Sequence, residues 1–147
     1  MGFSVERRGL SGARRLSARF MRLSFFWWPL TWALVIFVLM VIPVPPTPRL
    51  EGFNLFDKAV HLALFGSLAF LMGHYFAGNS PDVSYVAVFF KGMLAATAYG
   101  IFTEGIQALL PFRSAEAGDV LADALGAGAG SAAFVLWHKF RFRKKKM

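Results

Sequence analysis

The sequence between Arg22 and Arg49 contains no charged residue, and most of it is one apolar run from Phe25 to Ile42. The 18 residues of this run are close to the roughly 20 that a helix needs to cross the hydrocarbon core of a bilayer. The proline-rich stretch that follows cannot continue a helix, because proline lacks a backbone N–H. The run therefore predicts a membrane-spanning helix. A cleaved signal peptide is the rival interpretation, but no A-x-A cleavage pattern follows.

Three further apolar runs of helical length follow the first. They extend from about Phe56 to Phe76, from about Tyr85 to Leu110 before Pro111, and from about Gly118 to Trp137. The chain is 56% hydrophobic and only 16% charged, which is far more apolar than an ordinary soluble domain. We therefore expect an all-α membrane protein in which residues 24–138 form a bundle of four transmembrane helices.

The basic residues lie mostly at the two ends of the chain, whose formal net charge is +8. Residues 1–23 form a basic segment that is either an amphipathic interfacial helix or a disordered leader, and residues 139–147 form a basic tail. Positive residues favour the cytoplasmic side, and an even number of spans places both ends there. Basic tails beside apolar helices are typical of cytoplasmic membrane flanks, so we expect no nucleic-acid partner.

Polar residues gather at the predicted outer ends of the last three helices, with a loop before the fourth helix at the rim. Several of them are three or four residues apart, which places them on shared helix faces. Ionisable residues inside a membrane are costly and mark functional sites by default. The candidate pocket residues are Asp57, Lys58, His61, Glu104, Gln107, Arg113, Ser114, Asp119 and Asp123.

Small residues extend two of these faces along the helices. On the third helix Thr97 and Gly100 continue the acidic face, and on the fourth helix Gly126 and Gly130 continue the face of Asp123. Small residues at this spacing let helices approach closely in a membrane. We therefore expect the third helix to pack against the fourth, with the second helix closing the pocket.

The pattern leaves several chemistries open. His61, Glu104, Asp119 and Asp123 offer ligands for zinc, magnesium or manganese in a metal-assisted hydrolysis, although no H-E-x-x-H motif is present. Lys58, His61 and Arg113 suit recognition of an anionic head group. Proton coupling through His61 and Glu104 is a third interpretation. In a purely structural role, the same groups would pair to hold the helices together, with Asp119 capping the fourth helix.

Two segments resemble the VanZ-like family of bacterial membrane proteins: DKAVHLALFGSLAF, and AYGIFTEGIQALLPFRSAEAGDVLADALGAGAG. The family pattern is an Asp-Lys-x-x-His helix start, a Glu-x-x-Gln helix end, an Arg-Ser loop, and an Asp-x-x-x-Asn helix start followed by glycine. The resemblance covers Asp57 to Gly130, about half of the chain. The matching positions are Asp57, Lys58, His61, Phe65, Glu104, Gln107, Arg113, Ser114, Asp119 and Gly126. Asp123 departs from the pattern, since the family commonly has asparagine there.

The family takes its name from a protein linked to resistance to the glycopeptide teicoplanin, and the resemblance implies a bacterial cytoplasmic membrane location. We expect the outer pocket to bind an envelope lipid, a glycan or a lipid-linked precursor head group, with a role in the cell-envelope or glycopeptide-antibiotic response. A membrane hydrolase or transferase acting on such a head group is an alternative. A structural or assembly subunit of an envelope complex is another, and a homo-oligomer is also open. The sequence assigns no catalytic residue, metal or cofactor.

Overall fold

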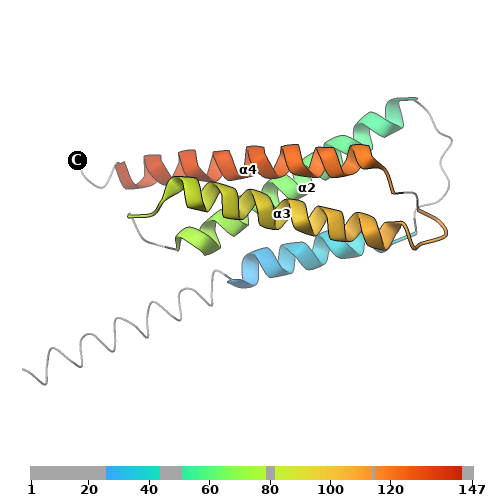
Figure 1. Cartoon of the computed structure of the whole chain (residues 1–147), viewed down its shortest axis with the longest axis horizontal. Helices are drawn as coiled ribbons and strands as arrows, with labels where there is room; N and C mark the ends of the chain where they lie inside the picture. Colours follow the sequence, from blue (N-terminus) through green and yellow to red (C-terminus); the bar gives the residue numbers. More distant parts are fainter. Residues whose placement is uncertain (1–25, 44–50, 79–81, 114, 144–147) are drawn as a thin grey trace, which may run out of the picture.

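The computed structural model describes residues 26–43, 51–78, 82–113 and 115–143, and of residues 51–54 the backbone alone. This part of the chain contains four helices and no strand. They are the first helix, Phe26–Val41, then α2, Glu51–Ala77, α3, Tyr85–Gln107, and α4, Ala117–Arg143. The helices pack lengthwise as a bundle (Figure 1). The prediction of an all-α four-helix protein is confirmed.

Three of these helices are long and apolar enough to cross a membrane: α2 from Leu55 onward, α3 and α4. The first helix is also apolar but is shorter over its described residues. Large apolar side chains cover the outside of the bundle, and Leu94, Ile101 and Leu136 are each more than half exposed. An outer surface of this kind suits lipid rather than water, so the chain is a membrane protein.

The last two helices differ in length from their predictions. α3 ends at Gln107, not at Leu110, and the next residues form a turn. Leu110 precedes Pro111, and the residue before proline is disfavoured in the α conformation, so the helix ends early. α4 continues beyond Trp137 to Arg143, because basic residues are favourable at the C-terminal end of a helix. The predicted segment 1–23 and residues 144–147 of the predicted tail lie outside the described residues.

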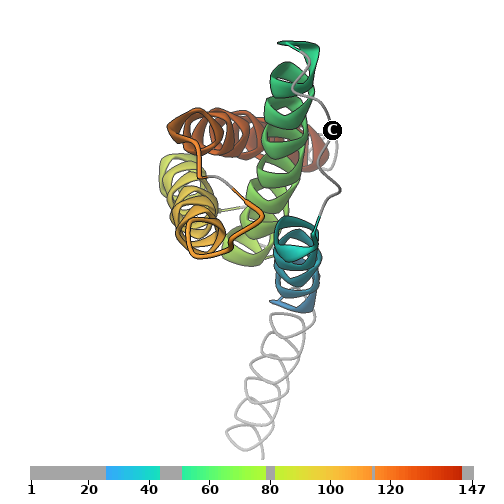
Figure 2. The ribbon, with the colours of Figure 1, turned by 90° about the vertical axis from the view of Figure 1, so that its right-hand side faces the viewer.

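The first helix lies against α2 and α3 on the side away from α4, as the view along the bundle shows (Figure 2). Several polar contacts hold it there, two of them in its first half. Trp32 Nε1 donates to Ser67 Oγ on α2 at 2.9 Å, and the Tyr99 hydroxyl on α3 donates to the Ala33 carbonyl at 2.7 Å. Each side chain thereby finds a partner inside the bundle, where a lone polar group would be costly.

The closest helix contact is between α2 and α4. A Cβ atom at Gly130 would overlap the Gly66 carbonyl, and one at Gly126 would overlap the Leu62 backbone. The expectation that these two glycines continue the contact with α3 is therefore wrong, because they face α2. α3 does pack on α4, and there Gly100 lies against the Asp123 side chain.

The apolar core lies beside these contacts. Phe65 and Leu68 of α2 and Ile36 of the first helix are fully buried, and they pack with Ala96 of α3 and Ala127 of α4. Large side chains from two helices thus meet small ones from the other two, which lets the four helices pack closely.

Gly130→Ala tests the close α2–α4 contact. The added methyl group would overlap the Gly66 carbonyl, and overpacking of this kind costs about 1–3 kcal/mol. We expect a lower thermal unfolding midpoint in detergent, measured by circular dichroism. Gly105→Ala is the matched control, because nothing lies within 4 Å of a Cβ atom there. An equal response of the two variants would contradict the contact.

Candidate functional site

The polar residues meet where α2 and α4 begin and α3 ends. Four of the predicted pocket residues are almost fully buried there: His61 is 3% exposed, Glu104 5%, Asp119 4% and Asp123 0%. The two N-terminal helix ends and one C-terminal end lie at the same end of the bundle (Figure 1). The predicted convergence of these helix ends is thus present in the structure.

His61 and Asp123 form a buried pair between α2 and α4. His61 Nδ1 lies 3.0 Å from Asp123 Oδ1, and the imidazole ring stacks on Phe65 one turn further along α2. The missing side chain of Gly100 leaves room on α3 for the Asp123 carboxylate. Since a carboxylate only accepts, the histidine nitrogen that faces it carries the proton.

Lys58 joins α2 to the start of α4. Its Nζ lies 3.3 Å from Glu116 Oε2 and 3.6 Å from Asp119 Oδ1. Its side chain passes over Gly118, where a Cβ atom would contact Lys58 Cε. The lysine side chain is 35% exposed, so its amine is held in the cluster and still reaches the surroundings.

Glu104 connects the end of α3 to the start of α4. Its Oε2 accepts a hydrogen bond from the backbone N–H of Glu116 at 3.2 Å, just before the first residue of α4. A carboxylate at this position satisfies a free N–H near the helix start and favours the positive end of the helix dipole. Glu104 therefore has a structural role in addition to any contact with a ligand.

Gln107 and Arg113 lie away from this cluster, and their side chains contact the first helix. Gln107 Nε2 donates to the Met40 carbonyl at 3.3 Å. Arg113 donates to the carbonyls of Leu39 at 3.3 Å and Ile42 at 3.1 Å. Both side chains thus satisfy carbonyl groups at the C-terminal end of the first helix. Their predicted place in the pocket is corrected accordingly, and Ser114 lies outside the described residues.

Glu116 also belongs to the cluster, although it is not among the pocket residues expected from the sequence. It contacts Lys58 through its side chain and Glu104 through its backbone. Its position three residues before Asp119, at the start of a predicted helix, could have indicated it, because acidic residues favour the first helical turn.

Carboxyl groups outnumber basic groups in this cluster. Five acidic residues lie in it or at its edge: Asp57, Glu104, Glu116, Asp119 and Asp123. In the described part of the chain, the basic residues that contact them are Lys58 and His61. Buried Glu104 Oε1, Asp119 Oδ1 and Asp123 Oδ2 have no hydrogen-bond partner among the described residues. Such groups are costly in an apolar environment, so the cluster has unused capacity for a proton, a donor or a cation.

One group of side chains within the cluster has the arrangement of metal ligands. Asp57, His61 and Asp119 each bring one ligand atom within 4.8 Å of the other two. The metal ligands expected from the sequence were His61 and Asp119 together with Glu104 and Asp123. In the structure Asp123 instead contacts Nδ1 of His61, and Glu104 accepts a hydrogen bond at the start of α4.

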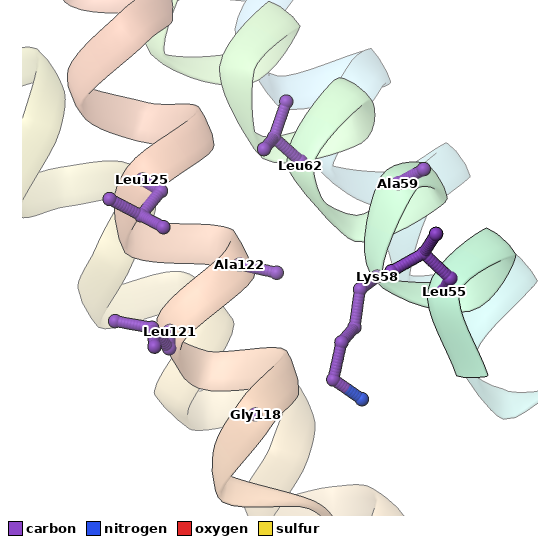
Figure 3. Close-up of a pocket in the computed structure, with 8 residues that line it drawn as sticks. All are labelled: Leu55, Lys58, Ala59, Leu62, Gly118, Leu121, Ala122 and Leu125. Atoms are coloured by element: carbon purple, nitrogen blue, oxygen red, sulfur yellow. The ribbon is translucent and has the colours of Figure 1, made fainter.

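An apolar groove of about 360 Å³ opens beside the cluster, between the diverging starts of α2 and α4. In Figure 3 the Lys58 side chain extends from α2 toward Gly118 of α4 within this groove. The lining residues are Leu55, Lys58, Ala59, Leu62, Gly118, Leu121, Ala122 and Leu125. Lys58 is the one charged residue among them, and it is shared by the groove and the cluster.

Comparison of the chain with protein-family models, with curated proteins and with solved structures gives no match. The family resemblance seen in the sequence therefore stays a prediction.

Replacing Arg113 tests its role on the first helix. Arg113→Gln would leave two carbonyl groups without their charged donor, and hydrogen bonds to charged groups contribute about 1.5–3 kcal/mol. We expect a lower thermal unfolding midpoint in detergent. Arg143→Gln, at the exposed end of α4, should leave the midpoint nearly unchanged. If Arg113→Gln is as stable as wild type, the two hydrogen bonds do not hold the helix end.

Proposed function

We propose that this chain is a VanZ-like protein of the bacterial cytoplasmic membrane that binds the anionic head group of an envelope lipid or lipid-linked precursor. The apolar chain of this lipid would lie in the groove between α2 and α4, and the lipid head group would meet Lys58. The observation that carries the proposal is that Lys58 lines the groove and also pairs with the polar cluster. An amphiphile with a negative head group matches both parts of this surface.

The proposed orientation places the cluster on the outer side of the membrane. The basic residues at both ends of the chain support cytoplasmic termini. The start of α2, the end of α3 and the start of α4 then face outward, while the turn between α2 and α3 faces the cytoplasm. A head group of the outer leaflet would reach Lys58 from the side, through the lipid-facing groove.

Single-cysteine labelling tests this orientation, because the chain has no cysteine of its own. Ala115→Cys, on the exposed segment before α4, should react with a membrane-impermeant maleimide in intact cells. Ser84→Cys, at the exposed start of α3, should react only after the cells are permeabilised. The reverse labelling pattern would place the cluster in the cytoplasm and contradict an outer-leaflet ligand.

Lipid binding tests the role of Lys58 and the groove. Native mass spectrometry of the detergent-purified protein with a polyprenyl phosphate should show weaker binding to Lys58→Gln and to Ala59→Phe. The first variant removes the cation, and the second fills the groove without changing charge. Loss of a charge-assisted contact should weaken binding about tenfold or more.

Lys91→Gln is the matched control, since this exposed lysine lies on α3 near its cytoplasmic end. It should bind the lipid as wild type does. Unchanged binding to both Lys58→Gln and Ala59→Phe would show that the groove is not the lipid site.

An enzyme that acts on the same head group is the second candidate, and the His61–Asp123 pair favours it. A buried carboxylate that holds an imidazole in one orientation is a common arrangement for general acid–base catalysis. The two candidates differ in their response to His61→Asn. An enzyme would lose turnover of a lipid-linked substrate but would still bind that substrate. A binding protein would change only in its affinity for the lipid.

A further inference from the structure

The strongest unexplained feature of the cluster is the set of three side chains at its outer edge. Asp57 and His61 are four residues apart on one face of α2, and Asp119 faces them from the first turn of α4. One ligand atom from each lies within 4.8 Å of the other two. One imidazole nitrogen and two carboxylate oxygens form a common ligand set for a divalent transition metal.

The partner of His61 orients it for metal binding. Nδ1 of the imidazole contacts Asp123 Oδ1 at 3.0 Å, and a carboxylate acceptor keeps the proton on that nitrogen. The lone pair is then on Nε2, the other ring nitrogen. A histidine held by a carboxylate in this way is the usual outer shell of a histidine that binds zinc.

Asp119 provides an independent observation that points to a ligand. Its side chain is buried, yet its Oδ1 has no hydrogen-bond partner among the described residues, and the nearest cation, Lys58 Nζ, is 3.6 Å away. The ion pair with Lys58 at this distance compensates only part of the cost of removing the Asp119 carboxylate from water, since Oδ1 has no hydrogen bond. A cation at the outer edge of the cluster would compensate the rest of that cost.

We propose that Asp57, His61 and Asp119 bind one divalent metal ion, with zinc as the preferred ion, and that Asp123 orients His61 for this purpose. Ligand atoms in a tetrahedral zinc site are about 3.3 Å apart at bond lengths near 2.0 Å, so the two carboxylates close on the ion by side-chain rotation. Three protein ligands leave the fourth position open, as in zinc sites that bind a water or a substrate oxygen.

Binding of the ion has a consequence for Lys58. The metal replaces Lys58 as the cation nearest to Asp119, and Lys58 keeps Glu116, 3.3 Å away, as its acidic partner. Lys58, which lines the groove, is then released from one of its two acidic partners. A phosphate of a lipid head group would meet Lys58 more readily, and this last point rests on the proposed function while the metal site does not.

The test is zinc binding to the full-length, tag-free protein in detergent, stripped with EDTA and measured by isothermal titration calorimetry without added lipid. We expect one zinc ion per chain and a higher thermal unfolding midpoint with zinc. Asp119→Asn and Asp57→Asn should each weaken binding by about 100-fold or more, since even outer-shell partners contribute about 10–100-fold. Asp123→Asn, which keeps an acceptor for His61, should weaken it by about 10–100-fold.

Glu116→Gln is the matched control, because it removes a carboxylate of the same cluster that is not one of the three ligands. It should change the zinc affinity by less than about threefold, as expected for a partly exposed charge. Asp57 is only partly buried, so Asp57→Asn keeps the test informative if Asp119→Asn does not fold.

Two results would overturn the metal site: no zinc binding by the stripped wild type, or an equal loss of affinity in Glu116→Gln and Asp119→Asn. Co²⁺ gives a second readout, since a tetrahedral site produces strong visible absorption that Asp57→Asn should abolish. If zinc fails to bind while polyprenyl phosphate still binds through Lys58, the metal site is wrong and the proposed function stands. If zinc binds and the lipid does not, the reverse holds.

Discussion

The backbone contact between α2 and α4 determines the geometry of the rest of the molecule. Gly66 and Gly130 bring the two parallel helices together without intervening side chains, and from that point toward their starts the helices diverge (Figure 1). His61 meets Asp123 where the gap is still narrow. Further out, the gap is spanned by the long side chain of Lys58 and opens to lipid as the groove. One crossing point therefore produces both a buried polar pair and an apolar opening beside it.

The sequence was sufficient to predict the helices, because runs of apolar residues must form helices to cross a bilayer. It was also sufficient to predict that Asp57, His61, Asp119 and Asp123 meet, since spacing and alternating chain direction place them at one end. It could not predict which neighbour Gly126 and Gly130 face. Membrane helices are apolar on nearly every side, so hydrophobic periodicity gives little information on the direction of packing.

Three residues near the turn after α3 lie elsewhere than the sequence predicted. Gln107 and Arg113 were expected in the pocket because they are polar and lie at the same membrane level. Gln107, the last residue of α3, instead faces the first helix. The early end of α3 before Pro111 brings Arg113 to the same helix, whose last carbonyl groups need donors. Glu116 enters the cluster for the same reason, because the short connection holds its backbone against Glu104. The exact path of this turn depends on contacts that no local pattern encodes.

The removal of Arg113 from the cluster changes what the cluster can bind. That arginine is engaged on the first helix. Among the lysines and arginines of the described residues, Lys58 is then the one that contacts the acidic groups, and it already pairs with Glu116 and Asp119. An anionic head group that approaches Lys58 must therefore overcome repulsion from several carboxylates in an environment of low dielectric constant. Binding of such a head group becomes favourable only if those carboxylates are neutralised by protons or by a cation. The charge balance thus couples occupancy of the groove to occupancy of the acidic cluster, whichever neutralising species is present.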